Sequence, residues 1–181
     1  MFQWKIIIGI IVILGGIAVV GSYILGAVKN PDSASALWGG VSKKVIPYYV
    51  LGMIFSAIAF LATAYYLFFK VDAASVKILG FLDFRFFLFI YLLILVPSAL
   101  WMPLTIKMVQ NPGAGTAYGI RIVLILVAIG SFLMFVSLLT LMPKVLDWSF
   151  YLAVIGSGLF FLHTAVLDAT LWTILFFRKY S

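Results

Sequence analysis

The chain has 181 residues, of which 66% are hydrophobic and only 9% are charged. A soluble domain carries about 25% charged residues, so this composition excludes a soluble globular protein and predicts an integral membrane protein in a lipid bilayer. The net charge of +7 does not indicate a nucleic-acid partner, because the Lys and Arg residues are scattered at the ends of apolar runs and mark the membrane–water boundary. The absence of cysteine excludes disulfides, thiolate metal sites and cysteine nucleophiles.

Five apolar runs reach the length of about 20 residues that a membrane helix needs. We therefore predict an all-α fold, a bundle of five transmembrane helices that forms a single domain over residues 1–181. The predicted spans are about 6–28, 47–69, 84–106, 118–142 and 150–177. The first run is longer than a signal-peptide core and ends without a clear cleavage site, so we expect a retained helix.

An odd number of spans places the two termini on opposite sides of the membrane. Basic residues are slightly more frequent on the side of the C-terminus, with seven against five on the other side. The positive-inside rule therefore favours a cytoplasmic C-terminus, in a bacterial inner membrane or an organellar membrane.

The first two spans carry patterns that allow two interpretations each. Small residues recur at helical spacing in the first span, at Gly15, Ala18, Ser22 and Gly26. Such a stripe lets helices approach closely, either inside the protein's own bundle or at the seam of a homodimer. In the long loop that follows, Trp38 either sits at the interface or belongs to a lid over the helix ends. Tyrosines near both ends of the second span, Tyr48, Tyr49, Tyr65 and Tyr66, are typical of aromatic belts.

The third span contains Pro97 near its centre and Pro103 near its end, with Trp101 between them. A proline removes one helical hydrogen bond and clashes with the preceding turn, so a kink or loosened turn is expected near Leu93–Pro97. This would open space in the half of the bundle that holds Trp101.

The fifth span carries His163 and Asp168 within the apolar run. An ionisable side chain at that depth costs at least about 2.5–3.5 kcal/mol unless it has a partner, which makes it a functional-site candidate. Arg121 lies on the same side of the membrane and reaches Asp168 only at the limit of its length; alternatively Arg121 points outward and Asp168 is protonated. Five residues correspond to about 140° around an α-helix, so His163 and Asp168 are expected on different faces and no His–Asp dyad is predicted.

Tryptophans and an acid around a loosened helix are typical of a ligand cavity with apolar walls and a few polar groups. The predicted ligand-binding residues are Trp38, Trp101, Arg121, His163, Asp168 and Trp172. No metal-ligand spacing and no catalytic constellation is found, so neither a metal site nor an enzyme is predicted.

Several motifs resemble the translocator protein / tryptophan-rich sensory protein family. These are the five spans, the long first loop with a Trp, Trp101-Met102-Pro103 in the third span, and Tyr151-Leu152-Ala153, Leu167-Asp168 and Leu171-Trp172 in the fifth. The resemblance implies a cavity for a tetrapyrrole, a sterol or a similar flat apolar ligand, closed by the first loop.

Three functions stay open at this point. The first is a non-enzymatic binding protein for a hydrophobic small molecule that is tetrapyrrole-, sterol- or lipid-like. The second is a structural or accessory subunit of a larger membrane complex, for which the small loops and apolar outer surfaces are equally suited. The third, a proton-coupled transporter that uses Asp168 and His163, is less favoured because five spans cannot form an even inverted repeat.

Overall fold

The computed structural model describes residues 2–179, apart from the side chains at positions 2, 34 and 35. Within this range, five helical segments are long and apolar enough to cross a membrane. They are α1 (Phe2–Lys29), α3 (Ile46–Phe69), α4 (Phe86–Gln110), α5 (Ala114–Thr140) and a final segment composed of α6 (Trp148–Leu162), the π-helix η1 (His163–Trp172) and α7 (Thr173–Phe177). The predicted all-α five-helix bundle is confirmed, and no predicted boundary is more than four residues from the observed one.

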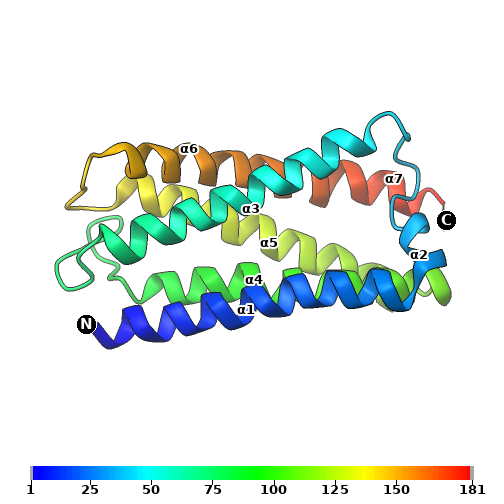
Figure 1. Ribbon diagram of the computed structural model, residues 1–181, viewed down its shortest axis with the longest axis horizontal. Coiled ribbons are helices and arrows are strands. Elements are labelled where there is room, and N and C mark those ends of the chain that lie inside the picture. Colours follow the sequence, from blue (N-terminus) through cyan, green and yellow to red (C-terminus); the bar gives the residue numbers. More distant parts are fainter. Residues whose placement is uncertain (1, 180–181) are drawn as a thin grey trace.

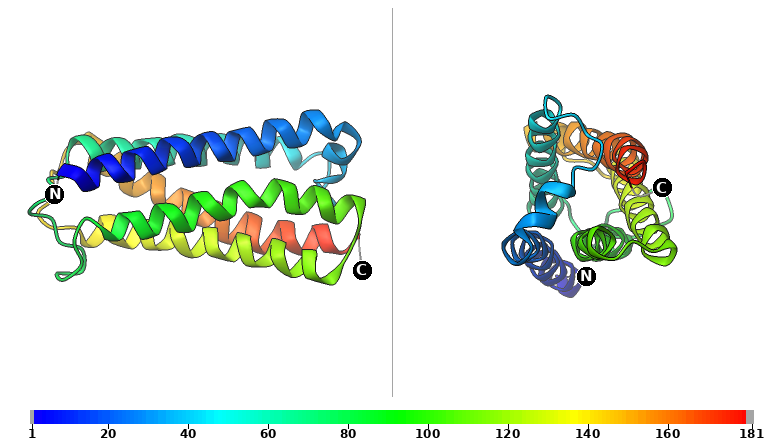
Figure 2. Two further views of the ribbon diagram at one scale, coloured as in Figure 1. Left: turned by 90° about the horizontal axis from the view of Figure 1, so that it is seen from below. Right: turned by 90° about the vertical axis from the view of Figure 1, so that its right-hand side faces the viewer.

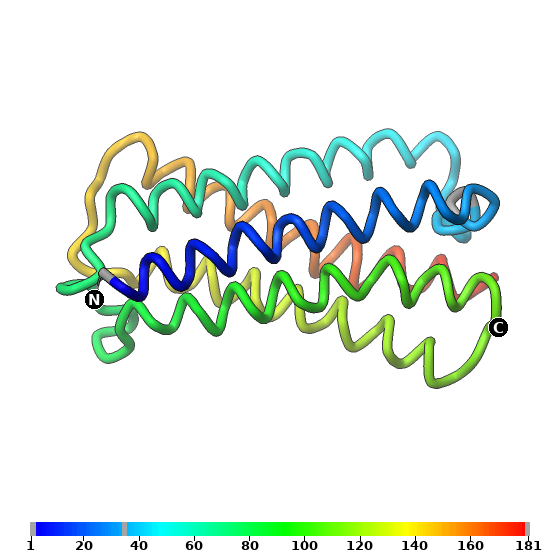
Figure 3. Tube along the Cα trace, turned by 60° about the horizontal axis from the view of Figure 1, so that its bottom comes forward, coloured from blue at the N-terminus to red at the C-terminus, as the bar shows by residue number. Residues whose placement is uncertain are grey.

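The helices lie side by side in an elongated bundle, with the two termini at opposite ends (Figure 1). α4 packs between α1 and α5, and α6 packs between α3 and α5. Seen end-on, the helices surround a common axis, and the first loop with the short helix α2 (Pro31–Ala36) crosses the end where the C-terminus lies (Figure 2). α1 runs alongside α4, as the trace in Figure 3 shows.

The small-residue stripe of α1 faces α4 in the same chain. A Cβ atom at Gly15 would lie 2.7 Å from Cδ1 of Leu95, and one at Gly26 would lie 2.5 Å from Cγ of Met102. Helices in lipid associate through such close packing because water exclusion does not drive them together. These two glycines therefore serve packing inside the bundle, which is the first of the two interpretations given above.

Pro97 and Pro103 lie within α4, which continues as a helix from Phe86 to Gln110. At the turn before Pro97, α5 approaches the α4 backbone closely, because a Cβ at Gly130 would lie 2.7 Å from Cγ1 of Ile94 and 3.3 Å from its nitrogen. The turn of α4 in which a kink or loosened turn is expected is therefore in close contact with α5.

Two loops close the end of the bundle near the N-terminus. Residues of the loop between α3 and α4 are buried, and Lys77 exchanges two backbone hydrogen bonds with Met142 of the loop between α5 and α6. Lys70, after α3, forms an ion pair of 3.0 Å with Asp147, which also caps the N-terminus of α6. The hydrogen bond from the Ser149 hydroxyl, the capping backbone N–H of Phe150 and the contact with Lys70 together lower the pKa of Asp147 to about 2.

Replacement of Gly15 by leucine should loosen the α1–α4 contact. The new side chain would overlap Leu95, and overpacking of this kind costs about 1–3 kcal/mol. The measurement is the thermal unfolding midpoint in detergent. Gly16→Leu is the matched control, because a Cβ at Gly16 has no neighbour within 4 Å. Equal midpoints for the two variants would contradict the assigned interface.

The depressed pKa of Asp147 predicts an acid-sensitive step in stability. The folded pKa of about 2 lies below the ordinary value of 3.8, so the ionised carboxylate stabilises the fold above about pH 4 and this contribution is lost as the pH falls toward 2. Asp147→Asn should lower the unfolding midpoint at pH 6 and have a much smaller effect at pH 2. An Asp147→Asn deficit of the same size at both pH values would exclude this role.

Candidate functional site

His163 and Asp168 lie on one face of the last helix, and the prediction that they would face different directions is wrong. Nε2 of His163 lies 3.6 Å from Oδ1 of Asp168. The reason is the π-helix η1, in which backbone hydrogen bonds join residue i to residue i+5, so that each turn contains more residues than in an α-helix and residues five apart come closer to one face. Because of this wider turn, the side chains of His163 and Asp168 lie next to each other, whereas an α-helix would place them about 140° apart around its axis.

Two threonine side chains support this wider turn. The Thr170 hydroxyl donates to the carbonyl of Ala165 at 2.8 Å, and the Thr173 hydroxyl donates to the carbonyl of Asp168 at 3.0 Å. Both bonds reach back five residues, which matches the repeat of the π-helix. π-Helical turns are rare in proteins, and those that occur often lie at functional sites. The ten-residue π-helix around Asp168 therefore makes this segment a candidate functional site.

His163 is held tightly against α3. It is 7% exposed, and a Cβ atom at Gly52 would lie only 2.7 Å from its Nδ1. The ring of Tyr49 contacts it edge-on, with centroids 6.4 Å apart. Nε2 is buried and has no hydrogen-bond partner among the described residues, because the distance to Asp168 exceeds that of a hydrogen bond.

Tyrosines from two further helices approach Asp168. Tyr49 of α3 and Tyr23 of α1 both lie near its carboxyl group. The Tyr49 hydroxyl donates a hydrogen bond of 3.0 Å to the carbonyl of Leu167, and the residue is buried. The aromatic-belt prediction is therefore wrong for Tyr49, and also for the buried Tyr66, while Tyr48 and Tyr65 are exposed as belts require.

Three helices contribute rings to a continuous aromatic cluster. The Trp101 ring of α4 lies 5.4 Å from the ring of Tyr23 and 5.4 Å from that of Trp172, and Trp172 stacks on Phe176 at 4.4 Å. Nε1 of Trp101 is buried without a hydrogen-bond partner among the described residues. The structure thus brings Trp101 and Trp172 together, as the sequence predicts, and adds Tyr23.

The first loop closes over the end of the last helix. Nε1 of Trp172 donates a hydrogen bond of 3.0 Å to the carbonyl of Leu37, and the backbone N–H of Gly40 donates to the carbonyl of Leu175. Gly39 has φ of +53°, and a Cβ there would lie 2.6 Å from Cα of Phe176, so glycine is required. Trp38 packs edge-on against Tyr49 at 6.2 Å, so of its two predicted positions the structure shows the one in a covering loop (Figure 2).

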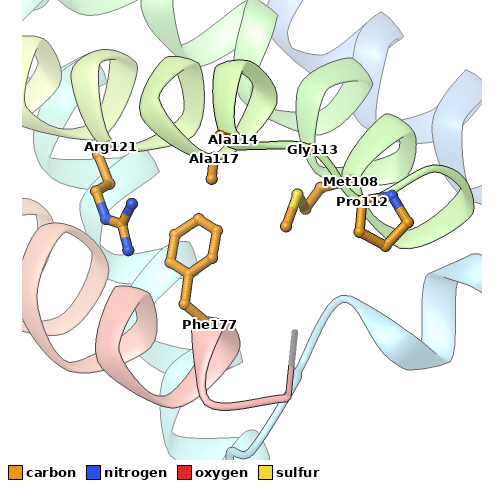
Figure 4. Close-up of a pocket in the computed structure, with 7 residues that line it drawn as sticks. All are labelled: Met108, Pro112, Gly113, Ala114, Ala117, Arg121 and Phe177. Carbon is orange, nitrogen blue, oxygen red and sulfur yellow. The ribbon is translucent and has the colours of Figure 1, made fainter. Parts of the chain in front are cut away.

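Arg121 is turned away from Asp168, which corrects the proposed Arg121–Asp168 pair. Its guanidinium lies over the ring of Phe177 at 4.1 Å, a cation–π contact. It lines an open hollow of about 360 Å³ between the α4–α5 turn and the end of α7 (Figure 4). No ion pair joins it to Asp168 in the described part of the chain.

Where the sequence predicts a cavity, the aromatic rings of Tyr23, Trp101 and Trp172 contact one another. A second hollow of about 310 Å³ lies on the outer surface between α3 and α6, beside Tyr65 and Trp148, and neither hollow is lined by Asp168 or Trp101. Asp168 nevertheless keeps 31% of its side chain accessible while it lies among Tyr23, Tyr49 and His163.

Comparisons with models of protein families, with curated proteins and with solved structures find no match of significance. Within residues 2–179, no three His, Cys, Asp or Glu side chains come together as a metal site would require. The chemistry of the site therefore has to be derived from its own residues, which offer hydrogen-bond acceptors at Asp168 and His163, an indole donor at Trp101 and several aromatic faces.

Sequence reasoning found four members of this cluster and missed three. His163, Asp168, Trp101 and Trp172 lie together, whereas Tyr23, Tyr49 and Gly52 were not predicted as site residues. Gly52 could have been recognised because it is an isolated glycine within an apolar helix. Such a glycine weakens the helix and often allows another element to pack closely against it. Tyr23 stands between two members of the small-residue stripe, Ser22 and Gly26, and so faces the bundle.

The contact between Gly52 and His163 can be tested with a double-mutant cycle. Gly52→Ala alone should lower stability by about 1–3 kcal/mol, because the added methyl group overlaps the imidazole. In a His163→Ala background the same substitution should be nearly neutral, since the ring is gone. Denaturant unfolding monitored by circular dichroism measures both effects, and additive losses would show that the two residues do not touch.

Proposed function

We propose that this is a non-enzymatic membrane protein that binds a hydrophobic small molecule with a polar group, at the contact between α1, α3, α4 and η1. The observation that carries the proposal is a pair of polar groups without a compensating partner, the buried Nε2 of His163 and the partly accessible carboxyl group of Asp168. The Asp168 carboxylate has no Lys or Arg within ion-pair distance among the described residues, and Nε2 of His163 has no hydrogen bond. A charge without a counter-charge at this depth is expensive, so its presence favours a ligand that compensates it.

The surroundings of this pair support the same proposal. Ligand sites are mostly apolar and aromatic, with a few polar groups that fix orientation. Trp101, Trp172, Tyr23 and Tyr49 provide such walls, and the first loop covers them from the C-terminal end of the bundle. The rings contact one another directly, so a ligand would enter by their displacement.

The resemblance to translocator proteins, which implies a tetrapyrrole, sterol or lipid as ligand, stays a prediction that the comparisons do not test. We further propose that the end of the bundle with α2 and the C-terminus faces the cytoplasm, because most basic residues lie there. The alternative of an accessory subunit becomes an outcome of the experiment below.

Protein purified gently from its native membrane should carry a bound apolar compound in its lipid extract. Addition of that compound to delipidated protein should quench tryptophan fluorescence. Trp101→Phe should weaken binding by about three- to tenfold, because an aromatic contact contributes about 0.5–1.5 kcal/mol. Trp148→Phe is the matched control, since Trp148 is exposed and lies beside Tyr65 at the other end of the bundle.

Two results would contradict the proposal. One is an extract with the composition of the bulk membrane together with a stable partner protein in the same preparation, which would indicate an accessory subunit. The other is equal affinity in the Trp101 and Trp148 variants, which would place binding elsewhere.

A further inference from the structure

Among the described residues, the candidate site contains one acidic side chain, Asp168, and no permanently positive one. Asp168 offers carboxylate oxygens, which accept hydrogen bonds. Nε2 of His163, which has no hydrogen-bond partner among the described residues, is a second acceptor 3.6 Å away. The groups that face Asp168 from the neighbouring helices are the phenols of Tyr23 on α1 and Tyr49 on α3. Arg121 on α5 is engaged with Phe177. The site as built lacks a permanent positive charge in the part of the chain that the structure describes.

Aromatic rings lie close to this acceptor pair. Tyr23, Trp101 and Trp172 form a chain of rings with successive centroids 5.4 Å apart, Trp172 ends the π-helix that contains Asp168, and Tyr49 contacts His163 edge-on. The face of an aromatic ring carries partial negative charge and attracts cations, most strongly for tryptophan and when water is excluded. A carboxylate among indole and phenol rings is complementary to an ammonium group.

The bundle is least tightly closed between α1 and α3, next to this site. α1 is the least buried of the five spans, since only 6% of its most apolar 18-residue stretch is buried. It packs on α4 and α2. A hydrogen bond from Lys5 to the carbonyl of Phe68 joins the beginning of α1 to the end of α3, whereas Tyr23 lies near the end of α1 and Tyr49 near the beginning of α3. Asp168 keeps 31% of its side chain accessible near the opposite end.

We infer that the site takes a lipophilic amine in its protonated form, which enters from the lipid phase between α1 and α3. The ammonium group donates hydrogen bonds to Asp168 and to Nε2 of neutral His163, and the apolar body lies against Trp101 and Trp172. This rests on the proposed function, because it names the chemical class of the ligand for the same site. A neutral alcohol can also donate to Asp168, but it leaves the carboxylate charge without a counter-charge.

The test compares two probes of nearly equal shape, 4-phenylbutylamine and 4-phenyl-1-butanol. Primary amines are protonated at pH 7 because their pKa lies near that of lysine. Binding is followed by tryptophan fluorescence of the full chain in phosphatidylcholine nanodiscs, with empty nanodiscs to correct for partition into lipid. The amine should bind at least about tenfold more tightly than the alcohol, because only the ammonium group brings a charge opposite to that of the carboxylate into the site.

Two variants connect the preference to this site. Asp168→Asn keeps the shape of the side chain and should abolish the preference for the amine, whereas Asp72→Asn, an exposed acid in the loop after α3, should retain it. If Asp168→Asn does not fold, Tyr23→Leu serves instead. It removes one ring and leaves the carboxylate in place, and it should weaken the amine about threefold more than the alcohol.

The outcomes separate this inference from the proposed function. Equal affinity for amine and alcohol in the native protein overturns the amine inference and leaves hydrophobic ligand binding intact. A preference for the amine that survives Asp168→Asn also overturns it, because the charge would then be read elsewhere. Failure of both probes to bind overturns the inference, and a native extract without an enriched compound then overturns the proposed function as well.

Discussion

A carboxylate within an apolar bundle is the constraint on which the rest of this structure depends. Asp168 cannot be solvated by lipid, so the chain around it is arranged to limit the penalty. The π-helix η1 brings His163 to within 3.6 Å of it, Tyr23 of α1 and Tyr49 of α3 lie near it, and Arg121 contacts Phe177 instead. Among the described residues, none of the groups that approach Asp168 carries a permanent positive charge.

The two ends of the bundle differ in how they are held together. At the N-terminal end, an ion pair, a helix cap and backbone bonds between two loops join α3, α4, α5 and α6. At the C-terminal end, the first loop is attached to the last helix by the bond from Trp172 to Leu37 and by the close fit of Gly39 on Phe176. The N-terminal end is therefore held by polar contacts among several elements, whereas the C-terminal end is closed by one loop.

Glycine positions determine where helices can approach closely, and the close approaches in this protein are of two kinds. Gly15 and Gly26 allow α1 to lie on α4, Gly130 allows α5 to lie on the turn before Pro97, and Gly52 makes room for His163. The first three serve packing, as expected where no hydrophobic force acts between helices. The fourth positions a side chain, and it connects the packing of α3 to the geometry of the site.

The sequence by itself determined the membrane character, the five helices and their boundaries, because apolar length and the positions of charges depend on local composition alone. It also placed Trp101 and Trp172 in one half of the bundle, since depth follows from counting residues along antiparallel helices. Only the tertiary structure decided that His163 meets Asp168, because residue spacing predicts directions only for an assumed helix type and the π-helix changes that type. It also decided that Arg121 pairs with Phe177, that Tyr49 turns inward and that Gly52 faces an imidazole, because each depends on the rotation of one helix against another.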